Sequence, residues 1–284
     1  MSRHVRLREF LVGVEGLALM RGLFTGSDEA AQARIDEVKR IVGDEEAELF
    51  GLGADTPELG VTDGYARWST TYDAPGNPLV SAEQAAVWEL IDRTAPGLAL
   101  DAACGTGRHA RRLAEQGHQV IGVDATTEML VRAREKAPDA RFEQADLRAL
   151  PFASDSFDLA VCALALDHVA QFPEAIAELA RVVRSDGRVI ISDLHPVVKV
   201  LGGAAFFRDS EGASGVVRGY GRSHAEYLDA FAACGLTVRR CLEPRFGPAE
   251  VEMQQPAWAF IPEATTAAYL DLPAALIWDL SLAS

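Results

Sequence analysis

The stretch LALDAACGTG at residues 98–107 carries the clearest structural signal in this sequence. Its apolar first half is typical of a buried strand, and the helical pattern of residues 108–116 follows directly after Gly107. A glycine-rich turn that joins a strand to a helix is typical of doubly wound α/β folds, which bind ligands at the carboxyl ends of their strands. Gly105 and Gly107 would let the backbone approach a ligand closely and present free amide groups to it. Taken alone, the stretch also satisfies a loose dinucleotide-binding pattern.

Helix and strand patterns alternate along most of the chain. Nearly continuous apolar strands separated by helices indicate a parallel sheet that is covered on both faces. The predicted strands are residues 97–101, 119–124, 141–144, 157–163, 188–193, 236–242 and 274–282. The predicted helices are residues 82–94, 108–116, 127–136, 173–183 and 223–234. The fold class is therefore α/β, with a doubly wound, mostly parallel seven-stranded sheet.

Residues 1–60 are predicted to form an N-terminal helical extension, and residues 61–284 the main domain. Apolar residues recur at helical spacing early in the chain, and charged residues interrupt the run at 10–24, so we expect a packed amphipathic helix and no membrane association. A second helix is expected from an N-cap at Ser27 to Phe50, followed by a loop over residues 51–64. The helices could cover the ligand pocket as a lid or pair between the subunits of a homo-oligomer.

The composition is that of a globular protein, because 49% of the 284 residues are hydrophobic and 24% are charged. The formal net charge of −15 disfavours nonspecific attraction to nucleic acid and to anionic membranes, because both are negatively charged. The cysteines form no Cys-x-x-Cys pair and no tight cluster with histidine, which argues against a zinc site and a disulfide framework and fits a reducing cytoplasm. They are Cys104, Cys162, Cys234 and Cys241.

Three aspartates follow successive predicted strands. Asp101 ends the first strand, Asp124 ends the second and Asp146 follows the third, so their side chains should lie along one rim of the sheet. Asp124 stands about where an acid accepts hydrogen bonds from ribose hydroxyls, and Asp146 could accept from the exocyclic amine of adenine. Aspartates at strand ends can also simply cap the helices that follow. Three of them beside one glycine turn favour a nucleoside-binding site.

In combination, these motifs resemble those of class I S-adenosylmethionine-dependent methyltransferases that modify small molecules. The resemblance covers residues 61–243 and rests on LDAACGTG (100–107), VD (123–124), ADL (145–147) and DSFD (155–158). It implies that Asp101 and the glycine turn hold the methionine part of S-adenosylmethionine, that Asp124 binds the ribose, and that Asp146 with Leu147 reads the adenine edge. The family usually has glycine where Ala103 stands. The cofactor-binding residues that the resemblance implies are Tyr65, Tyr72, Asp101, Ala103, Gly105, Gly107, Asp124, Met129, Asp146, Leu147 and Ala163.

The aromatic segment YARWSTTYD at residues 65–73 is similar to one that this family carries just before its sheet, where it often folds over the cofactor. The electron-rich face of an aromatic ring attracts a cation such as a sulfonium. Tyr65 and Tyr72 are therefore expected at the cofactor. The same aromatic side chains could instead fill the space between an N-terminal helix and the sheet.

Methyl transfer from a sulfonium depends mainly on proximity and alignment, and a base is needed only when the acceptor must lose a proton. His168 and His195 follow the fourth and fifth predicted strands on the rim where the cofactor is expected. Histidine can take up a proton near neutral pH, so each could be a general base or a hydrogen-bonded loop residue that shapes the pocket. Tyr220 and Arg222 could line the acceptor pocket.

The sequence thus predicts a cytoplasmic enzyme that transfers a methyl group from S-adenosylmethionine to oxygen, nitrogen or carbon of a small-molecule metabolite. One alternative is a protein of this fold that binds the cofactor but catalyses a rearrangement or cyclisation, or acts as a scaffold. Another is a nicotinamide-dependent oxidoreductase, but that class predicts an apolar strand end where Asp101 stands. A nucleic-acid substrate is disfavoured because the sequence has no basic patch.

Overall fold

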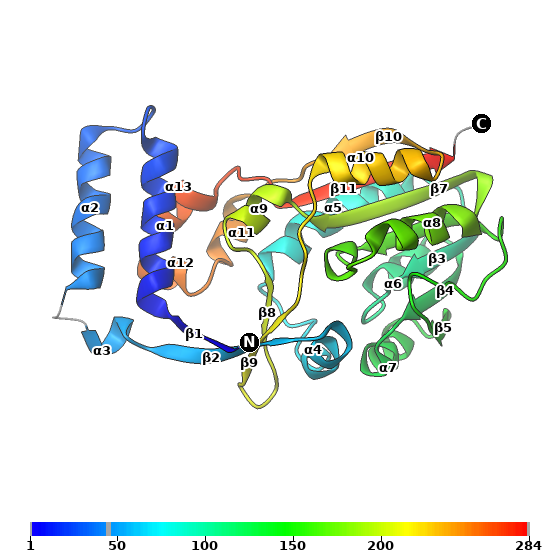
Figure 1. The fold of residues 1–284 in the computed structure, drawn as a ribbon, viewed down its shortest axis with the longest axis horizontal. Helices are drawn as coiled ribbons and strands as arrows, with labels where there is room; N and C mark the ends of the chain where they lie inside the picture. The colour runs from blue at the N-terminus through cyan, green and yellow to red at the C-terminus, as the bar shows by residue number, and fades with distance from the viewer. Residues whose placement is uncertain (1, 44–46, 283–284) are drawn as a thin grey trace.

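The computed structural model describes residues 2–43 and 47–282, and its centre is a seven-stranded sheet (Figure 1). In spatial order the strands are β10 (Leu236–Leu242), β11 (Ala275–Leu282), β7 (Val183–Leu194), β6 (Phe157–Ala163), β3 (Leu98–Ala102), β4 (Gln119–Asp124) and β5 (Arg141–Gln144). Strands β3 to β7 pair in parallel, and β11 lies antiparallel between β7 and β10. This confirms the predicted fold class. The strand order reverses at β3, which is where such sheets bind ligands.

Helices cover both faces of this sheet because successive side chains of a strand point to opposite faces. Ala99 packs in one hydrophobic core cluster and its neighbour Leu100 in another. The helices on the Ala99 side are α5 (Pro78–Asp92), α6 (Arg108–Glu115) and α7 (Thr127–Lys136), and those on the Leu100 side are α8 (Phe172–Val182) and α10 (His224–Ala233). Burial on both sides is the reason that the central strands β3 and β6 are almost continuously apolar in sequence.

The N-terminal segment contains the two predicted helices, α1 (Leu7–Gly22) and α2 (Asp28–Val42). The side chain of Ser27 accepts a hydrogen bond from the amide of Ala30, so it caps α2 as expected. The prediction that this helix continues to Phe50 is wrong, because α2 ends at Val42. Residues 44–46 lie outside the described residues, and the short helix α3 (Ala47–Phe50) follows them.

The loop predicted over residues 51–64 is wrong as well. Strand β2 (Gly53–Leu59) and the first turn of helix α4 (Val61–Trp68) lie there. β2 belongs to a second sheet of order β1-β2-β9-β8, whose other strands are β1 (Ser2–Arg6), β9 (Ser214–Val217) and β8 (Ala205–Arg208). The stretch GADTPEL has weak strand propensity, and pairing with β1 and β9 overrides it. The N-terminal extension therefore contains strands as well as helices.

The N-terminal helices pack against a group of helices from the C-terminal third of the chain. These are α12 (Ala257–Phe260) and α13 (Pro262–Tyr269), and α1 lies beside α13 at the left of Figure 1. The helix α11 (Pro248–Glu252) packs against α13 and α5. The cluster between α1, α2, α12 and α13 contains Leu11, Val14, Ala18, Ile41, Ala257, Ala264 and Ala268. The apolar face of α1 is therefore covered by protein, as its helical spacing predicted. No helix among the described residues is long and apolar enough to cross a membrane.

Candidate active site

A cavity of about 350 Å³ lies at the carboxyl ends of β3, β4 and β6. The predicted site residues in its wall are Tyr65, Tyr72, Ala103, Gly105, Asp124, Met129, Asp146, Leu147, Ala163 and His168. Tyr220 also lines it. Three predicted site residues, Asp101, Gly107 and His195, are absent from the lining. The cavity thus brings together most of the set that the sequence singled out.

Asp124 anchors the glycine turn from the end of β4. Its two carboxylate oxygens accept hydrogen bonds from the backbone amides of Gly105, at 2.9 Å, and Thr126, at 2.8 Å. Burial raises the pKa of this carboxyl, and the hydrogen bonds from the backbone act in the opposite direction. The sequence left helix capping and ligand binding as alternatives for Asp124. The side chain bonds to the backbone just before α7 and also lines the cavity, so the two roles are compatible.

Asp101 lies behind the turn and is 1% exposed. Its Oδ2 atom has no hydrogen-bond partner, and burial raises its pKa to about 7 although Arg108 lowers it. A buried carboxylate oxygen without a donor is costly, and such an atom in a native protein calls for a partner. An ammonium group would supply both a proton donor and a positive charge. The environment of Asp101 is therefore suited to binding a cationic ligand.

The turn itself follows a left-handed path. Ala103 has a φ of 59°, Gly105 a φ of 52° and Gly107 a φ of 84°. A left-handed conformation costs a residue with a side chain roughly 1–2 kcal/mol, which explains why glycine is the usual residue where Ala103 stands. At Gly107 there is a second reason, because an added Cβ would lie 3.0 Å from the Cα of Ala133 in α7.

The third aspartate is more accessible than the other two. Asp146 is about half exposed, and the guanidinium of Arg148 binds both of its oxygens, with Nη2 at 2.6 Å from Oδ2. This ion pair holds the pKa of Asp146 below its usual value. Met129 lies beside it on the cavity wall and is 1% exposed. The wall at this end therefore combines an apolar surface with an ionised carboxylate.

Tyr65 and His168 form a hydrogen-bonded pair in the cavity wall. The Tyr65 hydroxyl lies 2.8 Å from Nε2 of His168, and Nδ1 of His168 lies 2.6 Å from the carbonyl oxygen of Arg218. A carbonyl can only accept, so Nδ1 carries the proton and the Tyr65 hydroxyl donates to Nε2. Burial lowers the pKa of His168 and raises that of Tyr65 well above its usual value, which keeps both groups neutral.

The aromatic segment of α4 packs in two directions. Trp68 stacks on Tyr65 at 5.7 Å and on Phe207 of β8 at 5.4 Å between ring centroids. Tyr65 and Tyr72, whose rings are 6.1 Å apart, face the cavity. The segment therefore fills space beside the second sheet with Trp68 and supplies cavity wall with its tyrosines, so neither of the two sequence interpretations excludes the other.

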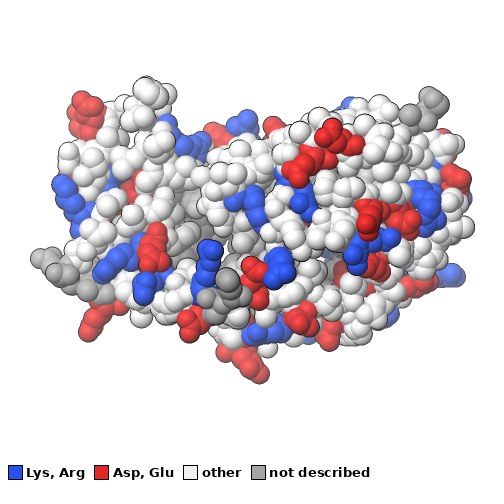
Figure 2. Space-filling view, in the orientation of Figure 1, with Lys and Arg blue, Asp and Glu red and all other residues white. Residues whose placement is uncertain are grey.

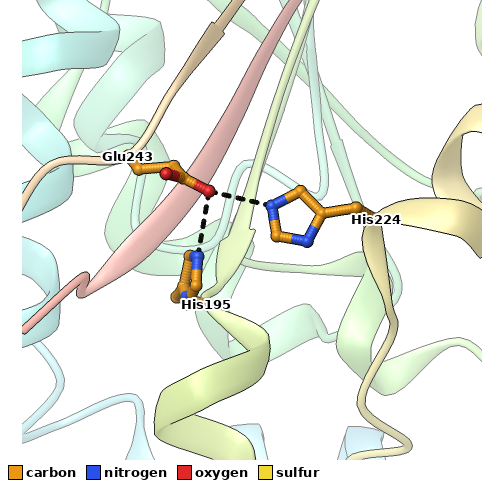
Figure 3. Close-up of side chains that lie close together, drawn as sticks. All are labelled: His195, His224 and Glu243. Carbon is orange, nitrogen blue, oxygen red and sulfur yellow. Dashed lines mark hydrogen bonds and ion pairs between the residues drawn. The ribbon is translucent and has the colours of Figure 1, made fainter.

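His195 follows β7 on the expected rim of the sheet, but it is not part of the cavity lining. It precedes α9 (Pro196–Val200), where its Nδ1 accepts from the Val197 amide, and its Nε2 faces the carboxylate of Glu243. The carboxylate also binds His224 (Figure 3). The structure does not bring His195 to the cavity wall. Arg222 is also outside the lining. Its guanidinium donates hydrogen bonds to the carbonyls of Val169 and Ala170, and these two residues line the cavity.

Sequence reasoning missed a buried ion pair near Asp101. Glu83 of α5 is fully buried, accepts from Arg108 at 2.8 Å and from the Ser192 hydroxyl at 2.6 Å. Burial alone would raise the pKa of Glu83, but Arg108 and His109 hold it at about 2. No local pattern marks this pair, because Glu83 stands in an ordinary amphipathic helix.

Known proteins resemble this chain in sequence and in fold. The family model for a methyltransferase domain matches residues 100–191. A malonyl-[acyl-carrier protein] O-methyltransferase of Erwinia pyrifoliae is 39% identical over 108 residues, which are 37% of this chain and 41% of that protein. A demethylmenaquinone methyltransferase of Deinococcus radiodurans is 37% identical over 117 residues, 39% of this chain and 48% of that protein. Less than half of the length of each relative is therefore matched.

Solved structures extend the likeness to most of the sheet. An S-adenosylmethionine-dependent methyltransferase from Mesorhizobium loti has a TM-score of 0.53 at 24% identity, over 71% of this chain and 99% of its own. A putative methyltransferase of Haloferax volcanii, solved with its Trm112 activator, has a TM-score of 0.57 at 21% identity. The match covers 78% of this chain and 98% of that one. Residues 100–191 therefore match the methyltransferase-domain family, and the seven-stranded sheet around them has the fold of class I S-adenosylmethionine-dependent methyltransferases.

Proposed function

We propose that this protein binds S-adenosylmethionine in the cavity at β3, β4 and β6 and transfers its methyl group to oxygen, nitrogen or carbon of a small molecule. The observation that carries the proposal is the cavity wall itself, where Gly105 of the glycine turn, Asp124 and Met129 come together. The unpartnered, buried Oδ2 atom of Asp101 lies behind that turn. The amino group of the methionine part would satisfy that atom. When bound, the cofactor supplies a methyl group that is already activated by the sulfonium charge.

The remaining wall residues suit the nucleoside. Asp124 would accept from the ribose hydroxyls while it keeps its bonds to the turn, and Met129 offers an apolar surface for the adenine. Asp146 with Leu147 would read the adenine edge. A nicotinamide dinucleotide has no ammonium group, so it would leave Asp101 without a partner. The charge of the site thus favours the sulfonium cofactor.

At the acceptor end, the pair of Tyr65 and His168 would handle the proton. The lone pair of His168 Nε2 is occupied by the Tyr65 hydroxyl, so an acceptor reaches this base through that hydroxyl. Tyr65 would take the acceptor's proton as it gives its own to Nε2, and the Arg218 carbonyl would keep the resulting imidazolium in place. His195 has no part in this step, because it does not line the cavity.

The proposed partner is a small molecule that accepts the methyl group, and the proposed location is the cytoplasm. We propose no nucleic-acid partner. On the face of the molecule in Figure 2, basic and acidic side chains lie side by side and form no basic patch. Residues 1–60 would act as a lid with the second sheet, since β2 pairs with β9 and the chain after β9 reaches the cavity at Tyr220. The helices α1 and α2 are also the proposed contact between subunits if the protein is a homo-oligomer.

Ligand binding tests the proposal. S-adenosylhomocysteine should bind by calorimetry and raise the melting temperature, whereas NAD and NADP should do neither. At 100 times its dissociation constant a ligand stabilises by about 2.7 kcal/mol. Asp124→Asn should weaken S-adenosylhomocysteine binding at least tenfold, and Asp55→Asn, which changes an exposed carboxylate on the second sheet, should leave it unchanged. Binding of NAD in place of S-adenosylhomocysteine would overturn the proposal. Binding without methyl transfer to any acceptor would favour a cyclase or a scaffold.

A further inference from the structure

A cluster of two histidines and one glutamate lies on the same rim of the sheet as the cavity but outside its lining (Figure 3). His195 follows β7, Glu243 follows β10, and His224 is the first residue of α10. β7 and β10 both pair antiparallel with β11, so they run in the same direction and end at the same rim. Three separate elements thus deliver one side chain each to a single point.

The atoms that converge there are the ones that metals bind. Nε2 of His195 lies 3.2 Å and Nε2 of His224 lies 2.9 Å from the same oxygen, Oε1 of Glu243, and all three atoms lie within 4.8 Å of one another. In a tetrahedral zinc site, with ligands at ~2.0–2.1 Å from the ion, neighbouring ligand atoms are about 3.3 Å apart. Both histidine nitrogens already stand close to that spacing from the carboxylate oxygen.

The charge of the cluster also suits a cation. Hydrogen bonds from His195 and His224 hold the pKa of Glu243 below its usual value, so the carboxylate is ionised. Within residues 2–43 and 47–282, neither lysine nor arginine forms an ion pair with Glu243. The side chains of His224 and Glu243 are 40% and 41% exposed, whereas that of His195 is 5% exposed. One ligand is therefore fixed in the protein, and the other two leave an open path from solvent.

We propose that His195, His224 and Glu243 form a binding site for a divalent transition-metal ion of the zinc type, with at least one coordination position left open. Two imidazole nitrogens and a carboxylate oxygen are a donor set that zinc and its neighbours prefer, whereas Mg²⁺ prefers oxygen ligands throughout. The ion would replace the two hydrogen bonds that now join the histidines to Glu243. The site is independent of the proposed cofactor cavity, because none of the three residues lines it.

Metal binding at this site has a specific structural consequence. Nδ1 of His195 now accepts from the Val197 amide at 3.2 Å, so the ring proton is on Nε2. An ion on Nε2 moves that proton to Nδ1, where it faces the amide and breaks the hydrogen bond. The first turn of α9 must therefore shift when the ion binds, and the Val197 amide becomes a reporter of occupancy.

The test uses protein that has been treated with a chelator and then titrated with Zn²⁺ against a chromophoric chelator. We expect one equivalent to bind, at least tenfold weaker binding in His224→Ala and in Glu243→Gln, and no binding of Mg²⁺. His4→Ala is the matched control, because His4 also faces a carboxylate, Asp55 at 3.0 Å, but without a second histidine. Its zinc affinity should equal that of the parent.

Two further readouts separate a metal site from a structural hydrogen-bonded cluster. Co²⁺ should give the visible absorption of a low-coordinate site, and the Val197 amide signal should move in NMR spectra as Zn²⁺ is added. Far-UV circular dichroism checks that each variant is folded, and Glu243→Gln keeps an oxygen for both histidines. S-adenosylhomocysteine affinity should be the same in all variants. The proposal is overturned if the parent binds no stoichiometric zinc, or if His224→Ala and Glu243→Gln bind it as tightly as the parent does.

Discussion

Asp101 and Glu83 show how a single neighbour sets the state of a buried carboxyl group. Both are buried on the same side of the sheet, and both interact with Arg108. Glu83 accepts directly from the guanidinium and from Ser192, and its pKa is about 2. Asp101 has an oxygen with no donor, and its pKa is about 7. Arg108 donates its hydrogen bond to Glu83, so Asp101 has an oxygen that is available to a donor on a ligand.

The affinity for S-adenosylhomocysteine should therefore depend on pH through Asp101. Below pH 7 the carboxyl is protonated in the free protein and must lose its proton to bind an ammonium group, so affinity should rise with pH up to about 7 and then level off. The slope should approach tenfold per pH unit. Calorimetry between pH 5.5 and 8 would measure it. Asp101→Asn should bind weakly and without this slope, and Asp92→Asn, on the surface, should keep it. An equal slope in Asp101→Asn would assign the proton to another group.

Ala103→Gly should stabilise the protein by about 0.5–1 kcal/mol. Glycine removes the penalty of the left-handed φ of 59°, roughly 1–2 kcal/mol, and adds about 0.5–1 kcal/mol of unfolded-chain entropy. Denaturant unfolding measures the difference. Ala102→Gly is the control, because Ala102 lies in β3 and is fully buried. There the same change loses packing and adds unfolded-chain entropy without removing a left-handed φ, so it should destabilise the protein. A loss of stability in Ala103→Gly would mean that the Ala103 methyl group is needed for packing.

At the level of elements, the sequence predicted the main sheet closely. The strands at residues 119–124, 141–144, 157–163 and 236–242 have the predicted ends. Of these, β6 is buried along most of its length, whereas the edge strands β5 and β10 carry exposed polar residues. The second sheet was not predicted. Its strands are short and partly polar, and they pair over long sequence distances, as β2 does with β9. Such strands form because they pair with strands that are distant in sequence, and a local sequence pattern carries no information about those partners.

The same distinction applies to the site. Asp101 and Asp124 could be predicted because each stands at the end of its own strand. The bond between Tyr65 and His168 joins residues 103 apart, and the one between His195 and Glu243 joins residues 48 apart. Sequence position suggested that His168 and His195 were equivalent. The structure separates them, since the chain after β6 turns into the cavity wall and the chain after β7 begins α9.

The contact between α4 and the 3₁₀ turn η1 (Leu166–His168) should control the chemical step. If Tyr65 relays the acceptor's proton to His168, Tyr65→Phe should lower kcat by about 10²–10⁴-fold, which is the usual contribution of general acid–base catalysis. The affinity for S-adenosylhomocysteine should change little. The parent's rate should fall on the acid side, below the ordinary histidine pKa, because burial lowers that of His168. Steady-state kinetics with an identified acceptor would measure both.

Tyr72→Phe is the matched control for this prediction, because Tyr72 lines the same cavity without bonding to His168. It should keep the parent's kcat and pH profile. A Tyr65→Phe variant with a raised KM and a normal kcat would make Tyr65 a positioning residue, and the transfer would then need no base.

Across the whole molecule, three buried carboxyl groups make folding sensitive to pH. The pKa values of Asp101, Asp193 and Glu15 are each about 7, mainly because burial disfavours their charged forms. In the unfolded chain they lose their protons near pH 4. The folded state therefore binds more protons between these values, and its stability is greatest at the acid end and falls as pH rises through 7.

The melting temperature of the ligand-free protein should accordingly fall between pH 6.5 and pH 8. At lower pH the buried histidines His109, His118 and His168 act in the opposite direction, because burial lowers their pKa values. Each group contributes on the order of 1.4 kcal/mol per pH unit, and each kcal/mol corresponds to about 2–4 °C in a protein of this size. Differential scanning calorimetry would show the trend. Glu15→Gln should flatten the curve by one group's share, and Glu9→Gln, which alters an exposed glutamate of the same helix, should leave its shape unchanged. A melting temperature that rises over this range would contradict the assignment.

The position of β11 determines when this fold can form during protein synthesis. β10 joins the sheet only by pairing with β11, and β11 pairs with β7 along residues 275–281, although it is translated some eighty residues later. A nascent chain on the ribosome can pair β3 to β7 early, but it holds β7 as a bare edge until residues 275–282 emerge. Bare edges recruit other chains. Translation that stalls before this strand would therefore yield an aggregating product and not a smaller folded protein.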